Sequence, residues 1–337
     1  MTELNQTALK IVSNGKGILA ADESTGTMTK RLDSINVISN PENRLMFREA
    51  LFSSKGMENF IGGVILFDET IKQNTKSGNS IPELINQSGA VIGIKVDAGA
   101  KVLAGSPEEK VTEGLDGLRE RLTEYYKLGA RFTKWRAVYN ITEKHPSELA
   151  IKSNAHALAR YAALVQEANM VPIVEPEVLM DGDHDINKCY EVTAKVLNEC
   201  YKELKLHNVD LKGTILKPNM ILPGNGSKNE SRTGEIAKMT LKCLKENVPG
   251  EVPGIAFLSG GQTEIEATQN LNEINKINDT NFAMSFSYGR ALQQSALKNW
   301  AKNISDIKKT QEIFNHRSKM NSLSSTSKWN KDLEKAS

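Results

Sequence analysis

The sequence lacks the features of several protein classes. Its three cysteines are odd in number and form no CxxC pair, which favours reduced, mostly structural thiols over a disulfide framework. Its apolar stretches, such as residues 62–67, fall far short of the roughly 20 residues of a membrane span. The first residues have no basic start followed by an apolar core, as a secretory signal would. We therefore expect a cytoplasmic protein with no membrane insertion.

Charge and metal-binding patterns are also weak. The chain has 43 basic and 41 acidic residues, a net charge of +2, and no polybasic block, so nucleic acid is not expected as the main partner. The five histidines are scattered, and the acidic run at residues 181–185 lacks the glycine and the distal glutamate of an EF-hand. A loop with a helix cap is the favoured interpretation of that run, and we expect no metal.

The length of 337 residues allows two domains or one large α/β barrel with additions. Strand-like segments recur about 30–45 residues apart, the size of a βα unit, and helix-like stretches such as 154–169 and 189–206 lie between them. The eight segments are 17–22, 64–68, 91–97, 131–138, 171–177, 213–218, 254–261 and 282–289. This alternation predicts a single (β/α)₈ TIM-barrel domain over residues 1–337. The alternative, a doubly wound sheet, lacks a GxGxxG loop after the first strand.

The two ends of the chain differ from the βα rhythm. Residues 1–16 predict a helical lead-in, and residues 299–314 predict a final helix. From about residue 318 the sequence is rich in Ser, Lys and Asn, which predicts a mobile C-terminal tail over about 318–337.

Polar or charged residues follow the apolar run of nearly every predicted strand. A charge inside a barrel core is costly, so we expect these side chains to converge at the C-terminal mouth of the barrel. The alternative is that each charge only begins a solvated loop, which is the better explanation for one strand but not for nearly all of the strands together. They are Asp22, Asp68, Lys95, Lys134 with Arg136, Glu175 with Glu177, Lys217, Ser259 and Arg290.

Strand geometry sharpens this expectation for the fourth and fifth strands. Side chains two residues apart share a face, so Lys134 lies beside Arg136 and Glu175 lies beside Glu177. Like charges on one face are unfavourable unless opposite charges are near. The two cations and the two carboxylates are therefore predicted to compensate each other across neighbouring strands.

Lys217 is the most suggestive single residue, because it follows Thr214-Ile215-Leu216 and precedes Pro218, which predicts a buried stem. A free lysine has a pKa of about 10.4 and is almost fully charged at pH 7. Burial and a neighbouring cation, for which Lys134 is the candidate, both favour the neutral amine. A neutral amine would attack a carbonyl and form a Schiff base. The alternative is a structural ion pair between Lys217 and Glu175.

Two segments are typical of phosphate binding. Residues 258–261 end the seventh predicted strand and residues 287–290 end the eighth, the positions where barrels often bind phosphate. Glycines admit an anion to backbone N–H groups, and Arg290 can pair with it bidentately. The candidate residues are Ser259, Gly260, Gly261, Ser287, Gly289 and Arg290. Near the N-terminus, residues 22–27 offer hydroxyls and a turn before Lys30 and Arg31, although an ordinary helix N-cap is the alternative there.

Six motifs together resemble the class I fructose-bisphosphate aldolases, from about residue 5 to about residue 320. They are Gly17-Ile18-Leu19-Ala20-Ala21-Asp22-Glu23-Ser24-Thr25-Gly26, Lys134-Trp135-Arg136, Val174-Glu175-Pro176-Glu177, Leu216-Lys217-Pro218-Asn219-Met220, Phe257-Leu258-Ser259-Gly260-Gly261-Gln262 and Ser287-Tyr288-Gly289-Arg290-Ala291-Leu292. The resemblance implies reversible cleavage of fructose 1,6-bisphosphate to dihydroxyacetone phosphate and glyceraldehyde 3-phosphate, without a metal or other cofactor, by a homotetramer.

The resemblance also implies residue roles. Lys217 matches the Schiff-base lysine and Glu175 the general acid/base. Lys134 matches the lysine that assists carbinolamine formation, and Asp22 the aspartate that handles the C4 hydroxyl proton. Glu177 and Arg136 match neighbours that position these groups. Ser259, Gly260, Gly289 and Arg290 match the C1-phosphate site, whereas Ser24, Thr27, Arg31 and Lys95 match the outer phosphate site, where Thr27 replaces a serine common in animal members.

One departure and two alternatives remain open at this point. Many members end in a tyrosine that assists enamine protonation, but no tyrosine follows Tyr288 here, so we expect release of dihydroxyacetone phosphate, and not C–C cleavage, to limit turnover. A non-catalytic scaffold for cytoskeletal or membrane-associated partners is one alternative, disfavoured by the complete catalytic set. A transaldolase-like Schiff-base enzyme is the other, and the two phosphate-binding segments favour a bisphosphate substrate over it.

Overall fold

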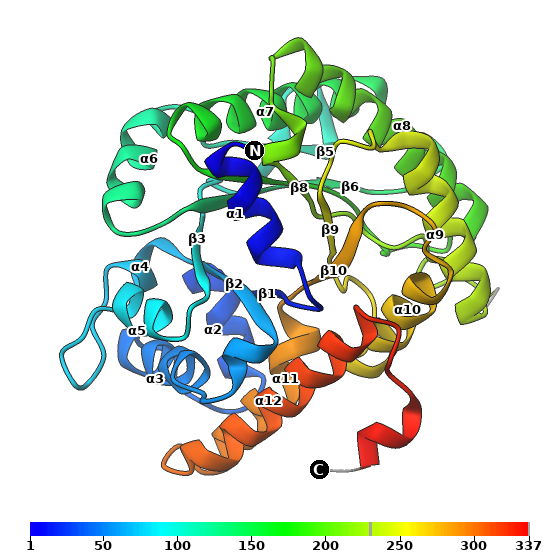
Figure 1. The fold of residues 1–337 in the computed structure, drawn as a ribbon. Coiled ribbons are helices and arrows are strands. Elements are labelled where there is room, and N and C mark those ends of the chain that lie inside the picture. The colour runs from blue at the N-terminus through cyan, green and yellow to red at the C-terminus, as the bar shows by residue number, and fades with distance from the viewer. Residues whose placement is uncertain (229–230, 336–337) are drawn as a thin grey trace.

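Eight parallel strands close a barrel in a computed structural model that describes residues 1–228 and 231–335. Each strand pairs with its neighbours in chain order, and β1 closes the ring by pairing with both β2 and β10 (Figure 1). The strands are β1 (Gly17–Ala21), β2 (Ile61–Leu66), β3 (Val91–Lys95), β6 (Phe132–Tyr139), β7 (Val171–Val178), β8 (Ile215–Leu216), β9 (Gly254–Phe257) and β10 (Ala283–Tyr288). The predicted TIM barrel is confirmed.

Helices cover the outside of the barrel because each has one apolar face. In α8, for example, Cys189, Val192, Val196 and Cys200 are buried at helical spacing, and the Asp185 side chain caps the first turn. The outer helices are α2 (Thr25–Asp33), α3 (Pro41–Phe52), α4 (Asp68–Ile71), α5 (Ile81–Gln87), α6 (Leu118–Lys127), α7 (Glu148–Glu167), α8 (Ile186–Leu206), α9 (Thr233–Asn247), α10 (Glu264–Ile277) and α11 (Arg290–Lys302), with short 3₁₀ turns η1 (Met57–Asn59) and η2 (Leu211–Gly213). None of the helices in the described residues combines the length and hydropathy that crossing a membrane requires.

The N-terminal end of the barrel is plugged. Helix α1 (Glu3–Val12) lies across this end in Figure 1, and its Ala8 and Ile11 join the apolar interior of the strands. The fit depends on a glycine, because a Cβ on Gly62 would lie 2.1 Å from the backbone oxygen of Ile11. Likewise a Cβ on Gly93 would lie 2.2 Å from the ring of Phe132, which fills the interior. An open site is therefore left to the opposite, C-terminal end.

A two-stranded antiparallel hairpin interrupts the βα pattern, and sequence analysis does not predict it. Strands β4 (Ala100–Leu103) and β5 (Ser106–Thr112) lie between β3 and α6. The buried Asn154 of α7 fixes the hairpin, since its side chain accepts from Thr112 N at 3.0 Å and donates to the carbonyl of Lys110 at 2.8 Å. Strand β5 is largely polar, and β4 has only the short apolar pair Val102-Leu103, which hides the strand character of this segment.

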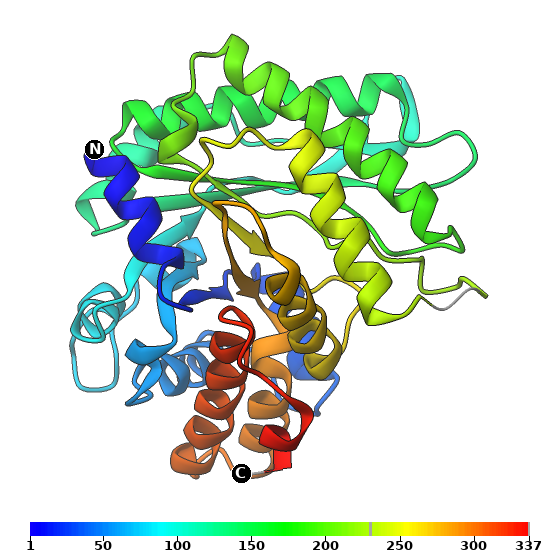
Figure 2. The ribbon, with the colours of Figure 1, turned by 45° about the vertical axis from the view of Figure 1, so that its right-hand side comes forward.

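The C-terminal segment differs from the expected final helix and tail. Two helices replace the single one, because α11 ends at Lys302 and α12 (Ile307–Ser324) packs beside it (Figure 2). Residues 318–324, where the tail was expected to begin, complete α12, and a 3₁₀ turn η3 (Lys331–Lys335) follows. Trp329 is buried and donates from Nε1 to Glu334 at 2.8 Å, while Arg317 pairs with Glu334. Residues 336–337 of the predicted tail lie outside the described residues.

Candidate active site

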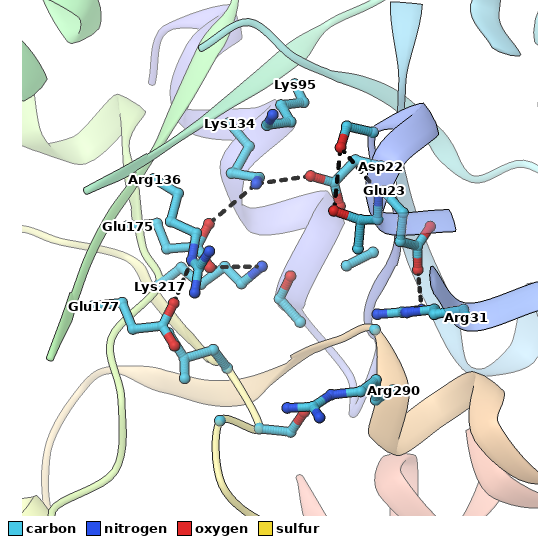
Figure 3. Close-up of a pocket in the computed structure, with 18 residues that line it drawn as sticks. Asp22, Glu23, Arg31, Lys95, Lys134, Arg136, Glu175, Glu177, Lys217 and Arg290 are labelled. Carbon is cyan, nitrogen blue, oxygen red and sulfur yellow. Dashed lines mark hydrogen bonds and ion pairs between the residues drawn. The ribbon is translucent and has the colours of Figure 1, made fainter. Parts of the chain in front are cut away.

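A cavity at the C-terminal mouth of the barrel holds the predicted site residues, with the exception of Gly261. Its lining comes from β1, β3, β6, β7 and β10, from residues directly after β1, β8, β9 and β10, and from Thr27 and Arg31 of helix α2 (Figure 3). The strand-end pattern predicts all of these positions except those on α2. The lining residues are Ala20, Asp22, Glu23, Ser24, Thr27, Arg31, Lys95, Lys134, Arg136, Glu175, Glu177, Lys217, Leu258, Ser259, Gly260, Ser287, Gly289 and Arg290.

Four buried side chains of alternating charge form the centre of this cavity. Lys134 Nζ lies 2.7 Å from Asp22 Oδ2 and 3.4 Å from Glu175 Oε2. The other oxygen of Glu175 lies 3.1 Å from Lys217 Nζ. Figure 3 shows Glu175 between the two lysines. Each side chain is at most 11% exposed, and the four formal charges sum to zero, which is how a buried charged cluster becomes tolerable.

The electrostatic effects follow from this arrangement. Burial opposes ionisation of Asp22, but the charges of Lys134 and Lys217 outweigh it and lower the pKa of Asp22 to about 2. Burial likewise opposes ionisation of Glu175, yet Lys217 and Lys134 lower the pKa of this carboxyl. For Lys134, burial favours the neutral amine, but Asp22 and Glu175 prevail and raise its pKa. Lys134 therefore stays a cation and both carboxylates stay ionised near neutral pH.

The backbone explains why these groups meet. Lys217 directly follows the last residue of β8, and its N–H donates to the carbonyl of Val174 on β7 at 2.8 Å, which sets the lysine beside Glu175. Arg136 on β6 is in register with Glu175 on β7, as expected for neighbouring parallel strands. Arg136 pairs with Glu177. The predicted compensation of two cations by two carboxylates is confirmed. Lys217 also contacts Glu175 at 3.1 Å, a contact that both interpretations of Lys217, the structural ion pair and the nucleophile, require.

One end of the cavity offers donors to an anion. Helix α11 begins at Arg290, and the first turn of a helix carries N–H groups without intrahelical partners. Ser287 Oγ is buried beside them and has no hydrogen-bond partner among the described residues. Gly260 brings its backbone close, since a Cβ there would lie 3.0 Å from Glu177 Oε1. A phosphate at this end would meet serine hydroxyls, backbone amides and the guanidinium of Arg290.

The other end contains a residue that sequence analysis does not select. Glu23 is buried and pairs with Arg31, and its second oxygen lies 3.6 Å from the guanidinium of the buried Arg48. Strand periodicity would turn Glu23 away from Asp22, but β1 ends at Ala21, so the rule no longer applies at these positions. Ser24 caps α2 through Thr27 N, so the N-cap alternative is also correct, although both residues line the cavity.

Two predicted strand-end residues lie elsewhere. Gly261 adopts a left-handed φ of +77° and its Cβ position would be 2.9 Å from Met180 Cβ, so it makes the turn after β9 and lines a neighbouring groove. Asp68 opens α4 and pairs with Lys72 at 2.8 Å, and it also accepts from the hydroxyl of Tyr125 at 2.7 Å. The end of β2 therefore carries a helix start and contributes nothing to the cavity lining.

Comparison with known proteins decides the family. A model of the fructose-bisphosphate aldolase class I family matches residues 3–337. The chain belongs to the class I fructose-bisphosphate aldolase family. A probable class 1 fructose-bisphosphate aldolase of Xanthomonas campestris is 51% identical, over 97% of this chain and 98% of its own length. Cytosolic fructose-bisphosphate aldolase 4 of Arabidopsis thaliana is 52% identical, over 95% of this chain and 82% of its own.

Solved structures agree with this family. A fructose-bisphosphate aldolase from Plasmodium falciparum, in complex with TRAP and a small-molecule inhibitor, superposes with a TM-score of 0.96 at 45% identity, over 97% of this chain and 95% of its own. The chain is thus a lyase of the aldolase type, and its reaction is the cleavage of fructose bisphosphate that defines the family. The transaldolase-like and purely structural alternatives are wrong.

Proposed function

We propose that the aldol cleavage proceeds through a Schiff base on Lys217. The observation that carries this proposal is the position of Lys217: its Nζ is buried at the barrel mouth, 3.1 Å from Glu175, in the cavity that Arg31 and Arg290 also line. Attack on the C2 carbonyl requires an unprotonated amine, and Glu175 is placed to take the proton. Loss of water from the carbinolamine then gives an iminium, with Glu175 supplying the proton to the leaving hydroxyl.

Cleavage of the C3–C4 bond needs a base at the C4 hydroxyl and an acceptor for the electron pair. Asp22, kept ionised by its low pKa and held by Lys134 at 2.7 Å, is the proposed base. The iminium on Lys217 accepts the electrons as an enamine, and glyceraldehyde 3-phosphate leaves. Protonation at C3 and hydrolysis then release dihydroxyacetone phosphate, the step expected to limit turnover. Glu177 orients Arg136 in this scheme.

The two phosphates are assigned to the two ends of the cavity. Ser259, Gly260, Ser287, Gly289 and Arg290 are proposed to hold the C1 phosphate, with Gly261 shaping the turn. Ser24, Thr27, Arg31 and Lys95 are proposed to hold the outer phosphate. A bisphosphate brings about three to four negative charges, which Arg31, Lys95, Arg136 and Arg290 offset, so the central carboxylates stay available for proton transfer.

Reductive trapping tests the proposal directly. Borohydride added with dihydroxyacetone phosphate is expected to attach the substrate irreversibly to Lys217, as peptide mapping by mass spectrometry would show, and Lys217→Arg is expected to abolish both trapping and cleavage. Lys95→Arg is the matched control, because Lys95 lines the same cavity but pairs with Asp97 at 3.1 Å, away from Glu175. Trapping at another lysine, or cleavage that survives in Lys217→Arg, would overturn the assignment.

We also propose that the protein works as a homotetramer in the cytoplasm. The family resemblance supports the tetramer, and the cytosolic plant relatives support the location. Sedimentation velocity of the full chain tests the first, and a fluorescent fusion tests the second. Binding of a protein partner is a second candidate role, supported by the complex that the Plasmodium falciparum relative forms with TRAP, and co-sedimentation with cytoskeletal filaments tests whether such a partner is cytoskeletal.

A further inference from the structure

Two histidines and a glutamate meet on the outside of the barrel, where α7 packs against α8 (Figures 1 and 2). His156 lies on α7, Glu203 lies on α8, and His207 caps the C-terminus of α8. Each side chain offers one ligand atom, and these atoms lie within 4.8 Å of one another. Across residues 1–228 and 231–335, this is the one group of three or more His, Cys, Asp or Glu side chains with such spacing.

The carboxylate is the centre of the cluster. Glu203 Oε2 lies 3.1 Å from His156 Nδ1 and 3.6 Å from His207 Nδ1. Glu203 and His207 are four residues apart, which puts them on one face of the helix. His207 Nδ1 lies 2.9 Å from the backbone carbonyl oxygen of Glu203, which can only accept, so Nδ1 donates its proton there and Nε2 is the nitrogen left to bind a metal. The two imidazole rings meet edge to face, with centroids 5.0 Å apart.

The donor set and its surroundings define which ion would fit. Two imidazoles and one carboxylate are typical ligands of zinc and related transition metals, whereas magnesium and calcium prefer oxygen ligands throughout. Metal–ligand bonds of about 2.0–2.2 Å place two ligands of a tetrahedral ion roughly 3.4 Å apart. The ligand atoms, which lie within 4.8 Å of one another, must therefore approach by up to about 1.4 Å, and the side chain of His156, which is 54% exposed, has room for that movement. Glu203 and His207 are only 16% and 21% exposed, so they supply the rigid part of the site.

We propose that His156, Glu203 and His207 bind one divalent transition-metal ion of the zinc class, with water in the remaining position. The site is separate from the catalytic cavity, since none of the three residues lines it. The ion would join α7 to α8, the helices that follow the strands carrying Lys134 and Glu175. Its expected effect is therefore on the stability of this part of the barrel, with no part in the cleavage chemistry. Arg160 and His207 line the same groove.

Zinc binding by the full chain, prepared without a polyhistidine tag and stripped with a chelator, tests the proposal. Isothermal titration with zinc chloride at pH 7.5 is expected to give one ion per chain, and Co²⁺ is expected to show the absorption of a four-coordinate site. His156→Gln and Glu203→Gln are each expected to weaken binding at least tenfold. Zinc is expected to raise the thermal midpoint of the wild type and not that of these variants.

The matched control is His316→Gln. His316 also faces a carboxylate, with Nε2 3.4 Å from Glu334, but it lacks a third ligand, so its loss is expected to leave zinc affinity unchanged. Binding is expected to weaken from pH 7.5 to pH 5.5, because protons compete for both histidines. Absence of stoichiometric binding at pH 7.5, or equal affinity in His156→Gln and the wild type, would show instead that the cluster is a proton-bridged ion pair and overturn the proposal.

Discussion

Replacing Lys134 with methionine removes the charge that joins the two central carboxylates while keeping the apolar stem. Lys134 is 5% exposed and lies 2.7 Å from Asp22 and 3.4 Å from Glu175. In Lys134→Met, Glu175 keeps Lys217 at 3.1 Å, but Asp22 loses its close ion-pair partner. We therefore expect this single substitution to destabilise the folded chain well beyond the cost of a surface change.

The magnitude follows from two estimates. The pKa of Asp22 falls from its usual 3.8 to about 2, which corresponds to about 2 kcal/mol of stabilisation of the folded state. Removing one partner of a buried ion pair typically costs about 3–5 kcal/mol, because the remaining charge is left unpaired. We expect Lys134→Met to lower the free energy of unfolding by about 3 kcal/mol at pH 7.

The sign of the pH dependence is fixed by the same pKa. A carboxyl whose folded pKa is depressed contributes its stability above its unfolded pKa and loses it as the pH falls through the folded value. The contribution of Asp22 is therefore complete above about pH 4 and disappears toward pH 2. The stability difference between wild type and Lys134→Met should shrink over that interval.

Urea unfolding of the full chain, followed by fluorescence at fixed protein concentration, measures these differences. Lys152→Met is the control: Lys152 is 55% exposed and pairs with Glu148, which is 79% exposed, so we expect a loss of about 1 kcal/mol or less. The double variant Asp22→Asn/Lys134→Met removes both charges of the close pair and should recover about half of the loss. A Lys134→Met protein as stable as the wild type, or a double variant no more stable than the single one, would refute the reasoning.

Two further predictions concern the ends of the barrel. Gly62→Ala should lower the free energy of unfolding by at least about 3 kcal/mol in urea titrations, because the new methyl group would lie 2.1 Å from the backbone oxygen of Ile11. The control is Gly234→Ala, where the new methyl group would have no atom within 4 Å, so this variant should be neutral or slightly more stable. Arg290→Ala should raise KM for the bisphosphate by about tenfold or more in steady-state assays, since a charged hydrogen bond contributes about 1.5–3 kcal/mol. Lys212→Ala is the surface control, and an unchanged KM in Arg290→Ala would argue against a phosphate at the Arg290 end of the cavity.

Much of the barrel and most of the cavity could be predicted because two simple rules apply to strands. Apolar runs mark the strands, and a charge at the end of such a run cannot turn into the core, so it must lie at the mouth. Glu175 follows Ile173-Val174 and Lys217 follows Ile215-Leu216, as these rules require, and the structure brings the two charges to 3.1 Å. The rules fail where the strand has already ended: Glu23 lies just past β1, and its direction depends on the turn and on Arg48, which is 25 residues away in sequence.

The features that sequence analysis misses depend on packing between distant segments. In the hairpin of β4 and β5, strand β5 has a largely polar sequence, and the place of the hairpin is fixed by Asn154 of α7. The C-terminal segment has a composition typical of a mobile tail, yet Trp329 packs and bonds with Glu334. His156 is 47 residues from Glu203, and only the packing of α7 on α8 brings them together. Local patterns carry no information about such contacts.

The two ends of the cavity that we propose for the phosphates differ in how their cations are paired. At the outer end Arg31 is already paired with the buried Glu23, and Lys95 with Asp97, so an incoming phosphate must share each cation with a carboxylate. At the other end, no carboxylate in the described part of the chain pairs with Arg290. Since an unpaired cation loses no partner when it binds an anion, the end at Arg290 has the stronger attraction for phosphate. The ion pairs at the outer end instead keep its cations in place and lower the electrostatic cost of the site when no phosphate is bound. Such pairing is needed because a barrel mouth with so many buried charges would otherwise be destabilised.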